Sequence, residues 1–499
     1  MEIRPPEPPP HAQSWSQGLA PRYIALFLLV VYFDQLPRRP LAIGGLLPSA
    51  GGLAIGAIFA VLLFFRPLAL SGLVSRGRLE DVCARTFGPG AAWLVPGLTM
   101  GLAHVVWFAV AIDYATDVSL RGLVGLGLID ASVLQPQRFG GRELPGGLVL
   151  WVAVVWSLAS AFLGLLTYRL VAAVMAGYQP FVAVALAVAA GWALPKASGF
   201  IPSGVDPLTD RAVAVGHGLA AAATMIEFLL GFFATHAALG VDWGRASREP
   251  ADVEIGGWVG IALAALTTGC LALLIVAGAE AGSVTDADST GGPANQDRPA
   301  LAATSPAEPE LRLTVREALS SGLLPAPVAG ILFLVLGVGL LGPVCFAPLL
   351  IARFMGILIP SAPSWAWTLL GAVGAWPLIL LRIPQRLDLV LTGLGITIGP
   401  MLGVLAADWW RTRGRGAASP GIRIPALMAW LAGMVFGGVL AVVAQRSTAI
   451  VPTLAAYAVA CLVALPFGRR AVESQAPPES ETSTDRAGPP HPPPPERPE

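Results

Sequence analysis

The sequence predicts an all-α integral membrane protein with about twelve transmembrane helices. Of its 499 residues, 55% are hydrophobic and only 12% are charged, whereas an ordinary soluble domain carries about 25% charged residues. The apolar residues fall in blocks long enough to cross a bilayer as helix, which takes about 20 residues. Because these blocks are continuous rather than alternating, we expect helices, and not a β-barrel, to satisfy the backbone in lipid.

Twelve apolar windows predict where the helices lie. The first window is interrupted by the sequence FDQLPRRP, and the first and ninth are short for a full crossing. Windows of about 19 residues place the spans at 22–37, 43–65, 91–114, 146–167, 172–193, 214–240, 255–278, 324–351, 364–381, 385–409, 424–444 and 448–467.

Three polar segments fall outside the predicted spans. Residues 1–20 and 471–499 are rich in proline, and such segments bury too little surface to fold. We therefore expect two disordered tails around a transmembrane domain over residues 21–470. Residues 280–318 predict a flexible polar loop within that domain. No signal-peptide pattern precedes the first apolar window, so that helix is expected to direct insertion.

The arginine distribution predicts the orientation in the membrane. More arginines fall on the loops that would be cytoplasmic if both termini were cytoplasmic, which matches the positive-inside rule. We expect a multi-pass protein of the cell inner (plasma) membrane in this orientation. The net charge is zero, so no nucleic-acid partner is expected. The expected partners are a small-molecule substrate and the lipid bilayer, and the sequence predicts no particular oligomeric state.

No motif predicts catalysis or a metal site. The four cysteines are far apart in the sequence and show no zinc-type spacing. Walker, G-x-S-x-G and H-E-x-x-H patterns are also missing from the sequence. We therefore expect a protein that is not an enzyme and that carries no metal and no cofactor.

Two apolar blocks end in similar Asp-Trp stretches, GVDWGRASRE at 240–249 and GVLAADWWRTRGRG at 403–416. Tryptophan favours the membrane interface and arginine reaches the headgroups. In the predicted orientation both stretches lie at cytoplasmic helix ends. Their charged residues are predicted to hold or release a cytoplasmic gate, or to be structural, and these residues are Asp242, Arg245, Asp408 and Arg411.

Three segments together resemble the nucleobase:cation symporter-1 family, the permeases for cytosine, purines, uracil, thiamine, allantoin and hydantoins. RTFGPGAAWLVPGLTMGLAHVVWF at 85–108 resembles the entry to the family's third helix. GVDWGRASREPAD at 240–252 resembles the exit of its sixth helix, and GPMLGVLAADWWRTRG at 399–414 the exit of its tenth. The three matches occur in the family's order and at helix ends.

The resemblance implies a five-plus-five inverted-repeat transporter fold with two additional helices, in which the first and sixth helices are broken at mid-membrane. It implies substrate binding between the repeats and alternating access. The family stacks a planar ring on aromatic residues that match Trp107 and Phe233. Its amide one turn beyond the tryptophan is replaced by Ala111. The eighth span also lacks the family's asparagine and Ser/Thr cluster, so a sodium site is not apparent.

Ionisable residues within the predicted spans are candidates for a functional or structural role, because a charge at mid-bilayer costs about 2.5–3.5 kcal/mol. His104 lies three residues from Trp107 and His236 three residues from Phe233, so each pair shares a helix face. One hypothesis is that Glu227 and His236 carry a coupling proton, with His104, also a candidate substrate residue, as the partner of Glu227. The alternative is that Glu227 forms a hydrogen-bonded pair that fixes helix packing. Two further acids lie nearer the outer ends and are expected to reach water, Asp34 and Asp113.

Two functions remain open from the sequence. The retained aromatic positions and the titratable groups favour a secondary active transporter for a small planar heterocyclic solute, such as a nucleobase, with the proton as possible coupling ion. The small number of polar residues at the expected substrate site favours the alternative, a non-transporting membrane sensor or orphan protein on the same scaffold.

Overall fold

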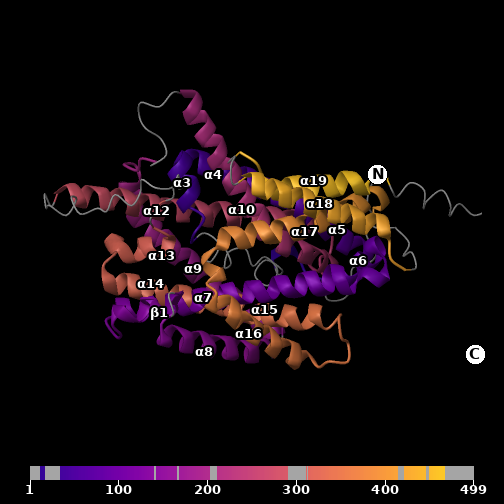
Figure 1. The fold of residues 1–499 in the computed structure, drawn as a ribbon, viewed down its shortest axis with the longest axis horizontal. Coiled ribbons are helices and arrows are strands. Elements are labelled where there is room, and N and C mark those ends of the chain that lie inside the picture. The colour runs from indigo at the N-terminus through magenta and orange to yellow at the C-terminus, as the bar shows by residue number, and fades with distance from the viewer. Residues whose placement is uncertain are drawn as a thin grey trace, which may run out of the picture.

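The computed structural model describes residues 12–16, 34–139, 142–165, 168–202, 211–289, 311, 313–413, 421–444 and 449–466. Most of these residues are helical, and the long helices run side by side along one direction (Figure 1). Within the described part, the strands form one short antiparallel hairpin of β1 (Gln137–Phe139) and β2 (Arg142–Leu144).

The described residues include nine helices, or stacked helical segments, that are long and apolar enough to cross a membrane. Two shorter apolar helices, α16 and α19, match the ninth and twelfth predicted spans. The all-α, multi-pass prediction is therefore confirmed, while most of the first predicted span lies outside the described residues. The helices are α3 (Arg38–Gly44), α4 (Leu46–Phe59), α5 (Arg66–Ser75), α6 (Leu79–Phe87), α7 (Thr99–Gly125), α8 (Gly147–Gly164), α9 (Tyr168–Ala197), α10 (Arg211–Arg245), α11 (Pro250–Gly257), α12 (Ala264–Ser289), α13 (Val315–Ala318), α14 (Ala326–Gly339), α15 (Leu341–Met355), α16 (Ser364–Leu380), α17 (Leu387–Thr412), α18 (Ile424–Ala444) and α19 (Pro452–Ala464).

Two groups of helices position the site. One group contains α7, α8, α15 and α16, which contact one another and lie together in the lower part of Figure 1. The other contains α10, α17, α18 and α19, which lie together in the upper part. α7 runs antiparallel to α14 and α15, since Gly101 lies against Met355 and Gly125 against Gly330.

A turn of π-helix interrupts both the second and the seventh spans. η1 (Ala60–Phe65) separates α4 from α5, and η5 (Trp258–Leu263) separates α11 from α12. The two π-helical turns contact each other. Such turns are uncommon and are often found near functional sites.

α10 packs unusually close to α5. A Cβ added at Gly72 would lie 1.8 Å from the carbonyl oxygen of Val241, and one added at Gly244 would lie 1.7 Å from that of Ala69. Only glycine permits backbones to approach this closely, and small residues drive helix association in lipid for the same reason.

The expected break in the sixth helix is wrong for this structure. α10 is one continuous helix of 35 residues. The stretch 220–240 contains no proline, and Gly231 serves close packing instead of a break, since a Cβ there would lie 2.4 Å from the carbonyl oxygen of Leu391.

The predicted polar loop at 280–318 is shorter than expected at both ends. α12 continues to Ser289, and α13 begins at Val315. Thr314 caps α13 by accepting from the backbone N–H of Glu317, whose side chain in turn accepts from the N–H of Thr314. This reciprocal capping box is a local signal that starts a helix. Residues 290–310 of the predicted loop lie outside the described residues, as do residues 1–11, 17–20 and 471–499 of the predicted tails.

Candidate functional site

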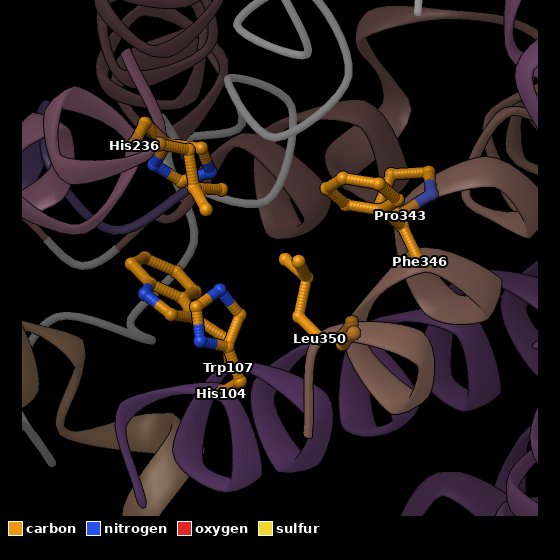
Figure 2. A pocket seen from close by; sticks show the side chains of 9 residues that line it. His104, Trp107, His236, Pro343, Phe346 and Leu350 are labelled. Carbon is orange, nitrogen blue, oxygen red and sulfur yellow. The ribbon is translucent and has the colours of Figure 1, made fainter. Parts of the chain in front are cut away.

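A small cavity of about 30 Å³ lies between α7, α10 and α15 (Figure 2). This volume accommodates about one water molecule, so the cavity is too small for a planar ring in this conformation. Figure 2 shows Trp107 and His104 on one side, His236 opposite, and Phe346 and Leu350 on a third helix. The lining residues are His104, Trp107, Ala111, His236, Leu239, Pro343, Phe346, Ala347 and Leu350.

Trp107 connects the two helix groups at this cavity. Its indole N–H donates to Thr235 Oγ1 of α10 over 3.1 Å. Its ring lies edge-on to Phe232, with ring centroids 5.3 Å apart, and to His236, with centroids 5.9 Å apart. The indole N–H of the buried tryptophan thus has a hydrogen-bond acceptor, and its ring packs against other rings.

Phe233 does not line the cavity, although the resemblance matched it to a stacking position. It is buried beside Phe232 and His236, edge-on to both, with centroid distances of 5.0 and 6.4 Å. His236 instead faces Trp107 from α10 and stacks on Phe232 at 4.8 Å. The structure therefore brings Trp107, Ala111, His104 and His236 together and leaves Phe233 behind them.

The residues of α15 that line the cavity were not predicted from the sequence, although their spacing indicates a shared helix face. Pro343, Phe346 and Leu350 are spaced by three and four residues, the spacing of one helix face. His104, Trp107 and Ala111 on α7 have the same spacing. α7 and α15 thus each present one face, with residues at the same spacing, to the cavity.

Both histidines have one ring nitrogen fixed by the backbone. His104 Nδ1 lies 2.6 Å from the carbonyl oxygen of Met100, and His236 Nδ1 lies 3.1 Å from that of Phe232. A carbonyl oxygen only accepts, so each Nδ1 carries the hydrogen. In a neutral imidazole, the remaining Nε2 is then an acceptor. No described residue donates a hydrogen bond to either Nε2, so two acceptor nitrogens remain on residues that line the cavity.

Glu227 lies elsewhere and has different partners from those predicted. Its Oε2 accepts from the backbone N–H of Thr453 over 2.8 Å, and its Oε1 accepts from Thr453 Oγ1 over 2.7 Å. The side chain of Thr392 in α17 lies near the same carboxyl group. Thr453 is in the first turn of α19, where backbone N–H groups lack acceptors within the helix. Glu227 thus connects α10 to α19 and α17, and the structure does not bring it to His104.

One end of α15 carries an ion-pair cluster, here named the Arg353 cluster, of Arg353, Asp242 and Glu80. Arg353 donates to both oxygens of Asp242, each over 2.9 Å. It also donates to both oxygens of Glu80, over 3.0 and 2.6 Å. Burial would raise the pKa of Glu80, but the hydrogen bond and charge of Arg353 outweigh burial and hold this pKa below its ordinary value.

The predicted gate residues divide between two places. The structure pairs Asp242 with Arg353 of α15, while the backbone carbonyl of the predicted gate residue Arg245 accepts from Arg76 Nη1 over 3.0 Å. Asp408 lies against Arg411 of its own helix and accepts from Thr86 Oγ1 of α6 over 3.2 Å. The Asp408 contact thus joins α17 to α6, the helix that also carries Glu80.

A second cluster, here named the Arg316 cluster, contains Arg316, Asp34, Asp117 and Tyr114. Arg316 Nε donates to Asp34 over 3.0 Å, and Nη1 donates to Asp117 over 2.8 Å. The guanidinium lies 4.1 Å above the ring of Tyr114, whose hydroxyl donates to Asp34 over 3.0 Å. Burial would lower the pKa of Arg316, but the charges of Asp34 and Asp117 hold it well above its ordinary value.

The expectation that Asp34 reaches water is wrong. Asp34 is only 1% exposed, because Arg316 and its backbone N–H close over it from α13. α13 lies in the segment that was predicted to be flexible loop, so no local pattern around Asp34 could indicate this partner.

The two clusters lie at opposite ends of α7, with the small cavity between them. The Arg353 cluster includes Glu80 from α6, which precedes α7, whereas Asp117 is near the C-terminal end of α7. α6 and α13 accordingly lie at opposite sides of Figure 1. Each cluster is built in the same way, with one arginine bridging two carboxylates.

No protein-family model and no curated protein matches the chain. Solved structures do match. The inward-facing conformation of Mhp1 aligns with a TM-score of 0.60 at 13% identity, covering 95% of this chain and 96% of Mhp1. The closed conformation of Mhp1 with bromovinylhydantoin bound, described as a nucleobase-cation-symport-1 family transporter, aligns at 0.58 and 14% identity, covering 93% and 96%. The fold is that of the inverted-repeat transporters.

More distant transporters share the same fold. A substrate-bound, outward-open Na⁺-coupled sialic acid symporter aligns with a TM-score of 0.51 at 12% identity, covering 90% of this chain and 89% of the symporter. A manganese transporter mutant from Eremococcus coleocola aligns at 0.50 and 15% identity, covering 93% and 97%. The five-plus-five architecture with two additional helices, expected from the sequence, is therefore confirmed as a fold.

The repeat architecture relates the two clusters. In a five-plus-five fold, the first three helices of one repeat correspond to the sixth, seventh and eighth of the chain. Asp117 lies on α7 of the third span and Arg353 on α15 of the eighth, so each cluster includes a residue from one of these two corresponding helices. Each cluster contains one arginine and two acids.

Proposed function

We propose that the protein is a secondary transporter that carries a small planar solute across the membrane by alternating access, with its solute site at the cavity between α7, α10 and α15. The observation that carries this proposal is the position of the cavity between two equivalent ion-pair clusters. The Arg353 cluster joins α15 to α10 at one side of the cavity, and the Arg316 cluster holds α7 at the other, so breaking one cluster would loosen one end while the other stays closed.

The proposed conformational cycle must enlarge the site. Small-molecule pockets are about 300–1,000 Å³, far more than the 30 Å³ present here. Breaking the Arg353 cluster would free α15 from α10 and α6, and breaking the Arg316 cluster would free α13 from α7. In the orientation predicted from the arginines, with cytoplasmic termini in an inner membrane, the Arg353 cluster is the cytoplasmic gate.

The lining supports a planar heterocycle with ring N–H groups as the solute. Trp107 and Phe346 offer aromatic surface, and α15 offers apolar walls. The acceptor Nε2 atoms of His104 and His236 suit N–H donors on the solute. Ala111 leaves no amide at the position that the symporter-1 resemblance indicates. The bromovinylhydantoin found in closed Mhp1 is the kind of ring that this lining would accept.

We also propose the proton as the coupling ion. The eighth span has no Ser/Thr cluster for sodium. Of the two residues proposed to carry the proton, His236 lines the cavity, so its protonation would change a group that faces the solute. Glu227 does not line it, and its bonds to Thr453 support the packing alternative instead.

A second candidate function is a sensor that binds a solute without moving it. The small cavity and its few polar groups favour this alternative. The two functions differ in whether the solute crosses the membrane, so binding and uptake must be measured on the same preparation.

A thermal-shift screen of the full chain with nucleobases and hydantoins, at two pH values, tests the site. We expect at least one ring to raise the unfolding temperature, with a clearly smaller shift in Trp107→Ala. Trp151 on α8 is 71% exposed and gives the control variant, Trp151→Ala, which should keep the shift. Binding with no uptake into proteoliposomes would favour the sensor, and neither binding nor uptake would contradict the proposal.

A further inference from the structure

A larger cavity of about 350 Å³ lies beside the Arg316 cluster. Its walls come from the start of α3, the C-terminal half of α7, α13 and the turn between α16 and α17, with the segment before α8 closing one side. In contrast to the solute cavity, its walls are strongly charged. Asp113 and Asp117 of α7 lie among its lining residues, together with Arg316 and Arg382.

Asp113 differs from the other acids near this cavity. Asp34 accepts from Arg316 and Tyr114, and Asp117 accepts from Arg316 and Arg121. No described residue donates a hydrogen bond to Asp113, which is nonetheless only partly exposed. Its carboxyl group therefore faces the cavity with its acceptor positions unused by protein.

The arginines around Asp113 are held by other groups. Arg316 is shared between Asp34 and Asp117, and Arg121 pairs with Asp117. Arg382 donates to Gln385, and Arg38 donates to the carbonyl oxygen of Leu311. The nearby positive charges therefore influence Asp113 without bonding to it.

Charged groups face Asp113 from every neighbouring element. Asp117 comes from its own helix, Arg316 from α13, Arg382 from the turn after α16, and Asp34 from the residues before α3. Arg38, Arg121 and Glu317 complete the charged lining of the cavity. Partial burial and the nearby carboxylates favour the protonated acid, whereas the arginines favour the ionised form. These opposed influences together determine how readily Asp113 binds a proton.

The place of Asp113 on α7 relates it to both the solute site and the Arg316 cluster. Ala111, two residues earlier, lines the solute cavity, and Asp117, one turn later, belongs to the cluster. When Asp113 is ionised, four acids balance four arginines around the larger cavity, Asp34 included. Protonation leaves one positive charge in excess among these arginines.

We propose that Asp113 is a proton-binding site reached from the larger cavity, and that proton uptake there loosens the Arg316 cluster. This inference rests on the proposed transport function and adds Asp113 to His236 as a residue that binds the coupling proton. The proton comes from water in the cavity and forms an O–H bond on the carboxylate, and its release returns it to water. The excess positive charge then weakens the packing of Arg316 among Arg121, Arg382 and Arg38.

Infrared difference spectroscopy on the full chain in liposomes tests the site without a solute. Acidification should produce the carbonyl-stretch bands of protonated carboxylic acids, and Asp113→Asn should remove one of these bands. Asp113→Glu should keep a band at a shifted frequency. Asp388, exposed at the start of α17, gives the matched control, since Asp388→Asn should keep the band. An unchanged spectrum in Asp113→Asn, or loss of the band only in Glu227→Gln, would overturn the inference.

A second readout separates this inference from the proposed function. With a solute identified in the binding screen, Asp113→Asn should abolish accumulation driven by a pH gradient but keep solute exchange. Full pH-driven accumulation in Asp113→Asn would refute the coupling role of Asp113 while leaving transport itself established. Absence of any uptake by the wild-type chain would instead refute transport, and the infrared result would still decide whether Asp113 binds a proton.

Discussion

Arg353 and Asp242 form a doubly hydrogen-bonded ion pair, with Nη1 donating to Oδ2 and Nη2 to Oδ1, each over 2.9 Å. The two residues are 111 positions apart in the chain. Arg353 also holds Glu80, so one guanidinium joins three helices at one end of the bundle. This relationship explains why an aspartate follows the apolar part of the sixth span.

Breaking this ion pair should lower the free energy of unfolding, and the effects of changing Arg353 and Asp242 should not be additive. Arg353→Gln would leave two carboxylates unpaired, and Asp242→Asn would remove one of them. Because all three side chains remain about a fifth exposed, we expect each single change to cost about 1–3 kcal/mol, less than for a fully buried pair. The double variant should cost less than the sum of the two, as measured by unfolding in detergent. Additive losses would show that the pair carries no coupling energy.

The ionised carboxylate of Glu80 should contribute to the stability of the fold, and this contribution should be lost at acidic pH. Its pKa in the folded protein is held below the ordinary value of 4.5, so its ionised form stabilises the fold above that value. This contribution is lost as the pH falls through the lowered pKa of the folded state. The unfolding temperature of the wild type should therefore fall below about pH 4.5, and Glu80→Gln should flatten this fall. Glu249→Gln, at an exposed position, is the control and should leave the fall in place.

Glu227 and Thr453 should behave as one structural unit. Glu227→Ala removes two hydrogen bonds from a buried carboxyl group, and each bond to a charged group is worth about 1.5–3 kcal/mol. We expect a loss of about 2–4 kcal/mol, with little added by a further Thr453→Ala change. Chemical unfolding measures both. If Glu227→Gln were stable but had lost pH-driven accumulation, the coupling hypothesis for Glu227 would replace the packing one.

Trp107 allows its stacking and hydrogen-bonding roles to be separated. Trp107→Phe keeps an aromatic face but loses the N–H that donates to Thr235. Trp107→Ala loses both. Aromatic pairs contribute about 0.5–1.5 kcal/mol in addition to the free energy of burying their surface. We expect solute affinity to fall about tenfold in Trp107→Ala and clearly less in Trp107→Phe. Calorimetric titration with the ring found in the screen measures this, and equal losses would indicate that only the Thr235 contact matters.

The sequence predicted the fold through properties that are local. Apolar length alone located the second to twelfth spans, since lipid requires a helix of nearly fixed length. The face shared by His104, Trp107 and Ala111 followed from helical spacing, and Phe346 and Leu350 were open to the same argument. The continuous path of α10 was not predictable from the resemblance, because Gly231 packs against Leu391 instead of breaking the helix.

The ion-pair partners could not be predicted, because nothing local specifies them. Arg316 meets Asp34 across 282 positions. Arg353 meets Glu80 across 273 positions.

Thiol labelling of Ala111→Cys shows whether the cavity between α7, α10 and α15 opens alternately to the two sides of the membrane. The native cysteines Cys83, Cys270, Cys345 and Cys461 are free thiols and would first be replaced by alanine. A membrane-impermeant thiol reagent would then be applied to one face or the other of sealed proteoliposomes of known orientation. Alternating access predicts labelling from both faces, with protection by the solute. Labelling from one face only, or from neither, would contradict it.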